Sequence, residues 1–181
     1  MECPPGEIFR RRDTVCYRRV MRIGVISDTH GLLRPEAVAA LAGVEHVLHA
    51  GDIGAEGLIG ELAAVAPVTA IRGNVDGEAW AEAFAETVTL MLGGVRLHML
   101  HDPKTLALDP VAQGIAVVIS GHSHRPAMAW RNGVLHLHPG AAGPRRFRLP
   151  VSLAILTVGE GAPLAEIVDL PLRAVTPPAV R

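Results

Sequence analysis

Seven side chains of types that commonly bind transition metals follow the ends of apolar runs. They are Asp28, His30, Asp52, Asn74, His101, His122 and His124. Asp28, for example, directly follows the run from Ile23 to Ser27, and His122 directly follows the run from Val117 to Gly121. In open α/β sheets, binding sites form beyond the carboxyl ends of the strands. We therefore expect five strand ends to bring all seven side chains into one crevice.

The spacing of these residues supports a common site. Two pairs, Asp28-x-His30 and His122-x-His124, are separated by one residue, and beyond a strand end both members of such a pair can turn toward one point. A glycine precedes Asp52, Asn74 and His122, and glycine permits positive φ and a close approach of the backbone. Taken alone, Asp52 could be a helix N-cap and Asn74 a turn residue. The full ordered set favours ligands.

The chemistry of the seven side chains indicates the kind of ion. Imidazole, carboxylate and amide donors suit Mn, Fe, Zn, Co or Ni better than Ca or Cu(I). The set is too large for one tetrahedral zinc ion, but it suits two ions that share a bridging carboxylate. Such ions, about 3.5–4 Å apart, stabilise both oxygens of an in-line phosphoryl displacement and lower the pKa of a bridging water. This predicts hydrolysis of a phosphate ester by a metal-bridging hydroxide.

The elements that must position these residues alternate in the first half of the chain. Strand-like runs end at Ser27 and span Val44–His49 and Pro67–Arg72, and helix-like stretches lie between them at Pro35–Ala42 and Glu56–Val65. This βαβαβ order predicts parallel strands joined by crossover helices. A short helical stretch at Glu78–Ala85 follows.

The second half is predicted to be mainly antiparallel. Two hairpins are expected, Thr87–Leu92 with Val95–Leu100 and Val151–Val158 with Leu164–Leu170, because glycines lie between the strands of each pair. Further strands are expected at Val117–Ser120 and Val134–His138, with Asn132-Gly133 as a turn, and a helix at Lys104–Gln113. The sum is an α/β fold in which two sheets pack face to face with helices outside.

The composition excludes several classes of protein. Hydrophobic residues make up 49% of the 181 residues and aromatic residues 3%, which indicates one globular domain with an aliphatic core. A formal net charge of −1 carries no strong nucleic-acid signal. No apolar run is long enough to span a membrane, and no secretory signal is present, so we expect a cytoplasmic protein. Both cysteines precede Met21, which excludes thiolate ligands from the main body.

Residues 1–20 differ from the rest of the chain. They carry five arginines against three acidic residues, a net charge of +2, and show neither helical nor strand periodicity. They are either a flexible basic arm or, as the favoured interpretation, the result of an upstream start codon with Met21 as the true first residue. We expect one domain at residues 21–172 and a tail at 173–181.

The ordered motifs resemble those of a known family. The motifs are Asp28-Thr29-His30-Gly31, Gly51-Asp52, Gly73-Asn74-Val75-Asp76, His101 and Gly121-His122-Ser123-His124. They are similar to those of the calcineurin-like metallophosphoesterases, and most of all to the small single-domain bacterial and archaeal phosphodiesterases, a branch related to the retromer scaffold subunit. The resemblance covers residues 21–172.

The resemblance implies a fold and a role for each residue. The family has a four-layer αββα sandwich, in which two mixed sheets are flanked by helices. By similarity, Asp28, His30 and His124 would hold the first metal, Asn74, His101 and His122 would hold the second, and Asp52 would bridge them. Members of this branch act on phosphodiesters in model assays, often with manganese. Family similarity is also compatible with a homodimer formed through an edge strand.

Three positions depart from the family pattern. Many larger relatives have a histidine directly after the asparagine ligand, where this chain has Val75. Asp102 stands where the family usually has glycine, and it adds a carboxylate that could act as a general acid. The sequence His138-Pro139-Gly140-Ala141 replaces a frequent Asn-Pro-Gly-Ser turn, so the substrate contacts of this turn differ.

Several other polar residues have two interpretations. His138 is either structural or a substrate contact, and Arg72 is either structural or a phosphate contact. Asp76 is interpreted as a cap for the following helical stretch. A basic cluster, Arg145, Arg146 and Arg148, is either a solvated loop or a rim that recruits phosphate.

Two functions from different classes fit the sequence. The first is an enzyme that hydrolyses a phosphodiester, or a phosphomonoester, as a small-molecule substrate. The alternative is a non-catalytic metal-binding scaffold of the same fold that binds a partner protein. The complete ligand set favours the enzyme, whereas a large exposed apolar patch away from the strand ends would favour the scaffold. A nuclease is the weakest hypothesis, because the net charge is near zero.

Overall fold

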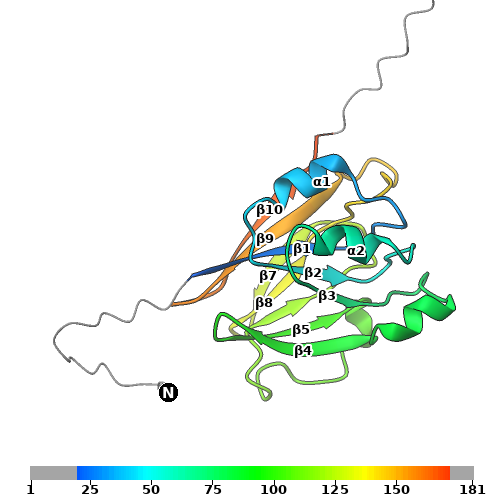
Figure 1. The fold of residues 1–181 in the computed structure, drawn as a ribbon. Coiled ribbons are helices and arrows are strands. Elements are labelled where there is room, and N and C mark those ends of the chain that lie inside the picture. Colours follow the sequence, from blue (N-terminus) through cyan, green and yellow to red (C-terminus); the bar gives the residue numbers. More distant parts are fainter. Residues whose placement is uncertain (1–19, 172–181) are drawn as a thin grey trace, which may run out of the picture.

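The computed structural model describes residues 20–171, which form two five-stranded mixed sheets packed face to face (Figure 1). The first sheet has the order β10-β9-β1-β2-β3. Its strands are β1 (Met21–Ile26), β2 (His46–Ala50), β3 (Val68–Ile71), β9 (Ser152–Val158) and β10 (Leu164–Asp169). Strands β1, β2 and β3 are parallel, so their carboxyl ends lie at one edge. Strand β9 is antiparallel to both β1 and β10.

The second sheet has the order β4-β5-β6-β8-β7. Its strands are β4 (Thr87–Leu92), β5 (Val95–Leu100), β6 (Val117–Ile119), β7 (Ala127–Arg131) and β8 (Val134–His138). The three central strands, β5, β6 and β8, are parallel, and the edge strands β4 and β7 are antiparallel to their neighbours. The predicted α/β fold with two packed sheets is confirmed.

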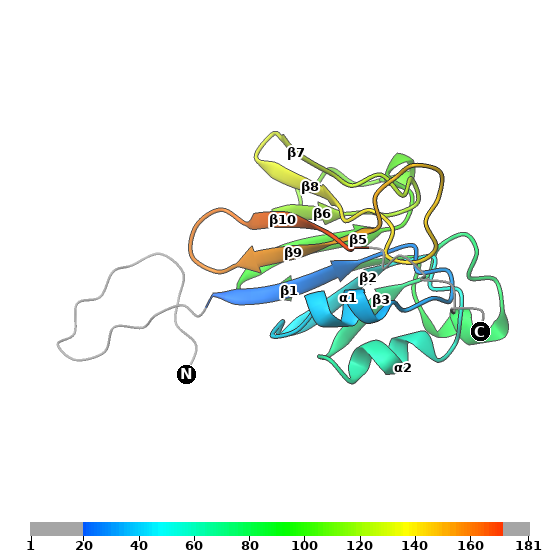
Figure 2. The same cartoon turned by 90° about the horizontal axis from the view of Figure 1, so that it is seen from above.

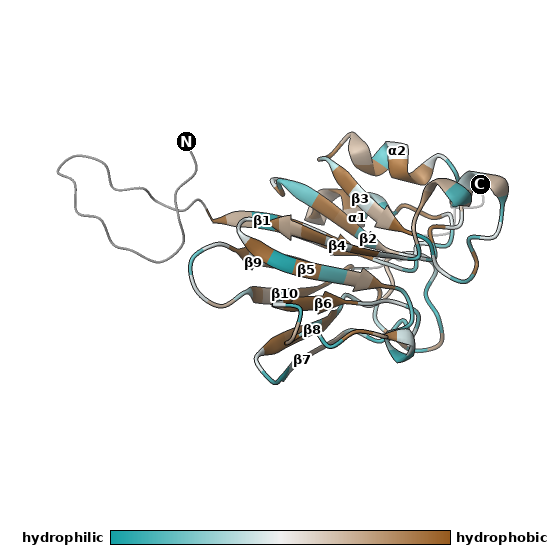
Figure 3. Ribbon diagram, turned by 90° about the horizontal axis from the view of Figure 1, so that it is seen from below, coloured by the Kyte–Doolittle hydropathy of each residue, from teal (hydrophilic) through white to brown (hydrophobic). Residues whose placement is uncertain are grey.

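Aliphatic side chains fill the space between the sheets. Leu48 of β2 and Leu97 of β5 are fully buried in this core, and Figure 3 shows the hydrophobic colour along strands of both sheets. On the outer face of the first sheet lie α1 (Pro35–Ala40) and α2 (Leu58–Ala63). Their buried Ala37 and Leu62 belong to a second core beneath the two helices, which Figure 2 shows side by side.

The outer face of the second sheet is covered mainly by loop. The predicted helix at Lys104–Gln113 is wrong, because only the short 3-10 helix η2 (Pro103–Thr105) forms there. Proline inside a helix removes a backbone donor, and Pro110 falls within the predicted span. In the structure, Leu106 and Leu108 pack against a small apolar cluster instead of forming a helical stripe.

Other predictions differ from the structure in smaller ways. The stretch predicted to be helical at Glu78–Ala85 is a 3-10 helix, η1 (Ala79–Ala83), and α2 is shorter than predicted. Strand β7 was not predicted, and its residues lack the alternation of buried and exposed positions that marks a strand. The N-terminal arm lies, except for Val20, outside the described residues, and so does the tail. No helix within residues 20–171 is long and apolar enough to cross a membrane.

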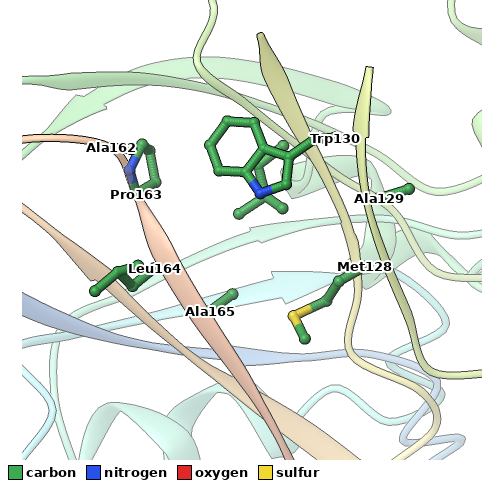
Figure 4. A pocket seen from close by; sticks show the side chains of 8 residues that line it. Met128, Ala129, Trp130, Ala162, Pro163, Leu164 and Ala165 are labelled. Carbon is green, nitrogen blue, oxygen red and sulfur yellow. The ribbon is translucent and has the colours of Figure 1, made fainter.

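An apolar groove of about 560 Å³ lies between β7 and the β9–β10 hairpin. It is lined in part by Met128, Trp130 and Leu164, which are 46%, 53% and 69% exposed, and Figure 4 shows Trp130 and Leu164 from the two sides of the groove. In the sheet register, Leu164 lies opposite Thr157, near the beginning of β1. The groove is therefore far from Asp28, which follows the other end of β1.

The packing predicts that two leucine-to-alanine substitutions lower the free energy of unfolding by different amounts. Leu97→Ala removes a fully buried side chain from the core between the sheets, and we expect it to lower the free energy of unfolding by about 2–5 kcal/mol. Leu164→Ala, at a 69% exposed position, should change it by less than about 0.5 kcal/mol. Urea unfolding of both variants measures the difference. Equal effects would contradict this description of the core.

Candidate metal centre

The loops that follow the parallel strands meet at one end of the sandwich (Figure 2). The backbone N–H of Asp28 donates to the Gly51 carbonyl at 3.0 Å, which ties the loop after β1 to the loop after β2. The Gly121 N–H donates to the His101 carbonyl at 3.0 Å, which ties the loop after β6 to the end of β5. This is the end at which the sequence predicted the site.

Four of the predicted side chains form a compact cluster. Donor atoms of Asp28, His30, Asp52 and His124 all lie within 4.8 Å of one another, a spacing that could hold a metal ion. The Nε2 atoms of His30 and His124 are 3.3 Å apart. His124 Nε2 is also 3.4 Å from Asp28 Oδ1, and His30 Nε2 is 3.7 Å from Asp52 Oδ2.

The other three predicted side chains lie beside this cluster. His122 Nδ1 is 2.9 Å from Asn74 Oδ1, and both residues are exposed. His101 is buried, and its Nε2 is 3.2 Å from Asp52 Oδ1. The two oxygens of Asp52 thus face His30 on one side and His101 on the other. The structure therefore brings together all seven residues that the sequence singled out.

The donor set fits divalent ions on an observation independent of the family. His101 Nδ1 lies 2.8 Å from the Ala50 carbonyl, which can only accept, so this nitrogen carries a proton. The other ring nitrogen, Nε2, is buried and has no hydrogen-bond partner of good geometry among the residues that the structure describes. It faces the Asp52 carboxylate, whose Oδ1 atom is 3.2 Å away. Such an arrangement is typical of an imidazole whose free lone pair binds a metal ion.

Burial sets the protonation of the compact cluster. It raises the pKa of Asp28 to about 6, although the Ser27 hydroxyl, which donates to Asp28 Oδ2 at 2.7 Å, opposes this. Burial lowers the pKa of His124 to about 4, and the neighbouring His30 and Arg146 act in the same direction. Burial also lowers the pKa of His30. Both imidazoles are therefore neutral at pH 7 and can donate a lone pair to a cation.

Asp52 and His101 shift each other in opposite directions. Burial opposes ionisation of Asp52, but the His101 imidazole and the Val75 N–H outweigh it and hold the pKa of Asp52 below its usual value. Burial likewise opposes protonation of His101, but the Asp52 carboxylate and the Ala50 carbonyl outweigh it and raise the pKa of His101. Each group thus favours the charged form of the other, and a metal ion would compete with a proton for His101 Nε2.

The backbone is strained where it carries these side chains. Seven non-glycine residues of the described chain have positive φ, and five of them belong to the predicted set: Asp28, His30, Asp52, His122 and His124. Positive φ is uncommon outside glycine and costs about 1 kcal/mol or more at each residue. Strain of this kind concentrates at functional sites. Of the three glycines that precede Asp52, Asn74 and His122, only Gly51 has positive φ.

Gly73 and Gly121 serve the close approach of loops instead. A Cβ atom on Gly73 would collide with Asp52 Oδ1, and one on Gly121 would collide with Ser27 Oγ. Even at Gly51, where φ is +90°, an added Cβ would lie 2.6 Å from His101 Nδ1. All three glycines are therefore needed for the loops to come together.

The predicted role of Asp76 as a cap for the following segment is wrong, because η1 has no side-chain cap within the described part of the chain. This carboxylate is buried and accepts three backbone N–H groups, from Ile53 at 3.0 Å, Gly54 at 2.8 Å and Gly73 at 2.8 Å. It thereby joins the loop after β2 to the loop after β3. The signal that could have revealed it is an acidic residue two positions after Asn74, in a loop whose N–H groups need acceptors.

The structure also shows the contacts of three other polar residues that the sequence singled out. His138 is buried and its Nε2 lies 2.9 Å from Ser123 Oγ, so it is a structural partner of this loop and makes no open contact surface. Arg72 pairs with Glu86 at 2.8 Å. Asp102 accepts from the Lys104 N–H at 3.0 Å and so caps η2.

Comparison with known proteins gives the same family as the motifs. Residues 21–161 match the calcineurin-like phosphoesterase superfamily domain. A probable metallophosphoesterase of Methanothermobacter thermautotrophicus is 33% identical over 152 residues, which cover 77% of this chain and 88% of the relative.

Solved structures agree on the fold. Vacuolar protein sorting 29 from Cryptosporidium parvum superposes with a TM-score of 0.71 at 19% identity, covering 84% of this chain and 92% of that one. An archaeal phosphodiesterase superposes with a TM-score of 0.68 at 24% identity, covering 82% of this chain and all of that one (100%). From the matched domain and the 33% identical relative, the chain belongs to the calcineurin-like phosphoesterase superfamily.

Proposed function

We propose that the chain is a dinuclear metal-dependent phosphoesterase that hydrolyses a phosphodiester, with phosphomonoesters as a second substrate class. One observation carries the proposal: seven metal-binding side chains from five strand ends converge. Asp52 lies between them, with one oxygen facing His30 and the other facing His101. In this proposal Asp28, His30 and His124 hold one ion and Asn74, His101 and His122 hold the other. Asp52 bridges them. Mn²⁺ is the ion we propose first, because it accepts nitrogen and oxygen donors.

The chain's own residues would orient the site and shape its charge. Two divalent ions, when bound, neutralise phosphate charge and lower the pKa of water. The Ala50 carbonyl orients the His101 ring, and the Ser27 hydroxyl orients the Asp28 carboxylate. The exposed Asn74 and His122 mark the open side, from which a substrate would arrive. Catalysis would then rest on positioning and electrostatic stabilisation.

Arg146 supports a phosphate-bearing substrate. Its positive charge lies close enough to disfavour protonation of His30 and His124. Gly143, three residues before Arg146, is held beside the site by two hydrogen bonds. Its N–H donates to the Asp28 carbonyl at 3.3 Å, and its carbonyl accepts from Arg34 Nε at 2.9 Å. An exposed arginine in this place would attract an anion toward the open side of the cluster.

A second candidate function is a partner-binding scaffold that keeps the metal centre. The apolar groove lined by Met128, Trp130 and Leu164 favours it, because the groove lies away from the strand ends that carry the donors. The fold of the chain is also similar to that of vacuolar protein sorting 29 from Cryptosporidium parvum. The complete donor set and the relative described as a probable metallophosphoesterase favour the enzyme.

Loss of one donor should abolish hydrolysis without unfolding the chain. With Mn²⁺, we expect the native protein to cleave bis(p-nitrophenyl) phosphate. Asn74→Ala removes an exposed donor and should lower kcat/KM at least about 100-fold, which corresponds to about 2.7 kcal/mol of lost transition-state stabilisation. His101→Ala should do the same.

Glu86→Ala is the matched control, since it removes an exposed side chain that pairs with Arg72. It should leave the rate unchanged. Equal activity of the native, Asn74→Ala and His101→Ala proteins, with normal circular dichroism, would exclude the proposed roles. A native protein that binds Mn²⁺ but cleaves no phosphate ester would favour the scaffold.

Metal affinity should weaken as the pH falls. Asp28 must be ionised to bind a cation, and its pKa of about 6 means that protons compete below this pH. At pH 5 this one group should weaken Mn²⁺ binding about tenfold relative to pH 7. His101, whose pKa is raised, should add to the loss, whereas His124, with a pKa of about 4, should not compete at pH 5. Mn²⁺ titrations between pH 5 and 8 measure the slope, and a constant affinity would contradict the assignment of Asp28.

A further inference from the structure

Two buried histidines have the same relation to the two donor pairs, Asp28 with His30 and His122 with His124. In the first pair the middle residue is Thr29, and its Oγ1 lies 2.8 Å from Nε2 of the fully buried His49. In the second pair the middle residue is Ser123, and its Oγ lies 2.9 Å from Nε2 of the buried His138. Each histidine therefore contacts the hydroxyl of the residue that lies between the two metal-binding residues of a pair.

The two histidines occupy equivalent places in the two sheets. Each lies near the end of a strand that runs parallel to, and beside, the strand that leads into the donor pair: β2 beside β1, and β8 beside β6. His49 is opposite Ile26, two residues before Asp28. In the second sheet the register runs to Ile119 opposite Leu137, and its next step sets His138 opposite a residue two before His122. One arrangement thus occurs twice.

The hydrogen bonds on the other ring nitrogen fix the same tautomer in both rings. The Gly51 N–H donates to His49 Nδ1 at 3.3 Å, and the Gly140 N–H donates to His138 Nδ1 at 3.0 Å. Both glycines have positive φ, +90° and +86°. Since Nδ1 accepts in each neutral ring, the proton is on Nε2, which therefore donates to the hydroxyl.

Burial keeps both rings in this neutral state. It lowers the pKa of His49 and of His138 to about 4. The hydroxyl of Thr29, which accepts from His49, is free to donate to the Ile53 carbonyl at 3.0 Å. The contact therefore extends from β2 through Thr29 to the residue after Asp52.

The backbone explains why the middle residues need an anchor. In the first pair φ is +54° at Asp28 and +45° at His30, and in the second it is +74° at His122 and +57° at His124. Each middle residue thus lies between two strained residues, and strained conformations persist only where the surroundings hold them. A hydrogen bond to the middle side chain supplies that hold.

We propose that His49 and His138 are positioning residues that fix Thr29 and Ser123 and so aim both donors of each pair at the ions. This inference rests on the proposed metal centre. Removal of a residue that hydrogen-bonds to and orients the ligands of a metal site commonly weakens metal binding about 10- to 100-fold. We expect losses of this size here, without contact between either histidine and the substrate.

Two substitutions of His138 separate its hydrogen bond with Ser123 from its hydrogen bond with Gly140. In His138→Gln the amide nitrogen can still reach Ser123, and the bond from Gly140 is lost. In His138→Asn the amide oxygen can still accept from Gly140, but the side chain is too short for Ser123. Mn²⁺ titration followed by electron paramagnetic resonance measures the affinity, and urea unfolding measures the stability of each variant.

The expected pattern of Mn²⁺ affinities depends on whether the hydrogen bond with Ser123 is kept, and not on the stability of each variant. We expect His138→Gln to bind Mn²⁺ within about threefold of the native protein, and His138→Asn and Ser123→Ala to bind it about 10- to 100-fold more weakly. The double variant Ser123→Ala with His138→Asn should be no weaker than either single variant, because both remove the same bond. His49→Gln, His49→Asn and Thr29→Val should repeat this pattern for the first pair.

His46→Asn is the matched control, because His46 Nε2 also lies 2.8 Å from a threonine hydroxyl, that of Thr69, which is not between donors. It should leave the Mn²⁺ affinity unchanged. Native affinity in both His138→Asn and Ser123→Ala, or additive losses in the double variant, would overturn the inference while the metal centre stands. A native protein that binds no Mn²⁺ would instead overturn the proposed function and this inference with it. Ser123 is exposed, so Ser123→Ala keeps the test decisive even if a buried histidine variant does not fold.

Discussion

The site depends on one constraint: carboxylate and imidazole groups that can donate electron pairs lie close together in a largely buried place. The Asp28 carboxylate is fully buried, and the Nε2 atoms of His30 and His124 are 3.3 Å apart. Within residues 20–171, His101 Nε2 has no hydrogen-bond partner of good geometry. Without a cation, burial disfavours the charged forms of these groups, and it raises the pKa of Asp28 and lowers the pKa of His30 and His124. The same groups around divalent ions would each have a counterpart, which is why a metal centre accounts for the arrangement better than a structural polar cluster.

The rest of the molecule makes this concentration sterically feasible. Two aliphatic cores hold the parallel strands whose ends carry the donors, and glycines let the loops approach to distances that a Cβ would prevent. Positive φ at five donor residues is strain that the fold must hold in place. Asp76, His49 and His138 make hydrogen bonds to backbone and hydroxyl groups of these loops, so residues outside the seven donors also help to hold the loops in place.

Sequence reasoning succeeded where the signal is local and failed where it is not. The parallel strands, both glycine hairpins and the convergence of the donors follow from apolar runs that end in polar residues. The Lys104–Gln113 segment has helical composition, but its apolar residues pack on the sheet as a loop, and strand β7 forms because β8 offers an open edge. Asp76 accepts from backbone N–H groups of Ile53 and Gly54, and His138 contacts the Ser123 hydroxyl. These partners lie in other segments, so no spacing within one segment reveals either role.

Crystals of the Mn²⁺-loaded protein, measured at the manganese absorption edge, test the central claim most directly. The account predicts two anomalous-scattering peaks about 3.5–4 Å apart, with the Asp52 carboxylate between them. His30 and His124 should contact one peak, and His101 and Asn74 the other. A single peak, or peaks that do not contact Asp52, would contradict a bridged pair of ions at this site.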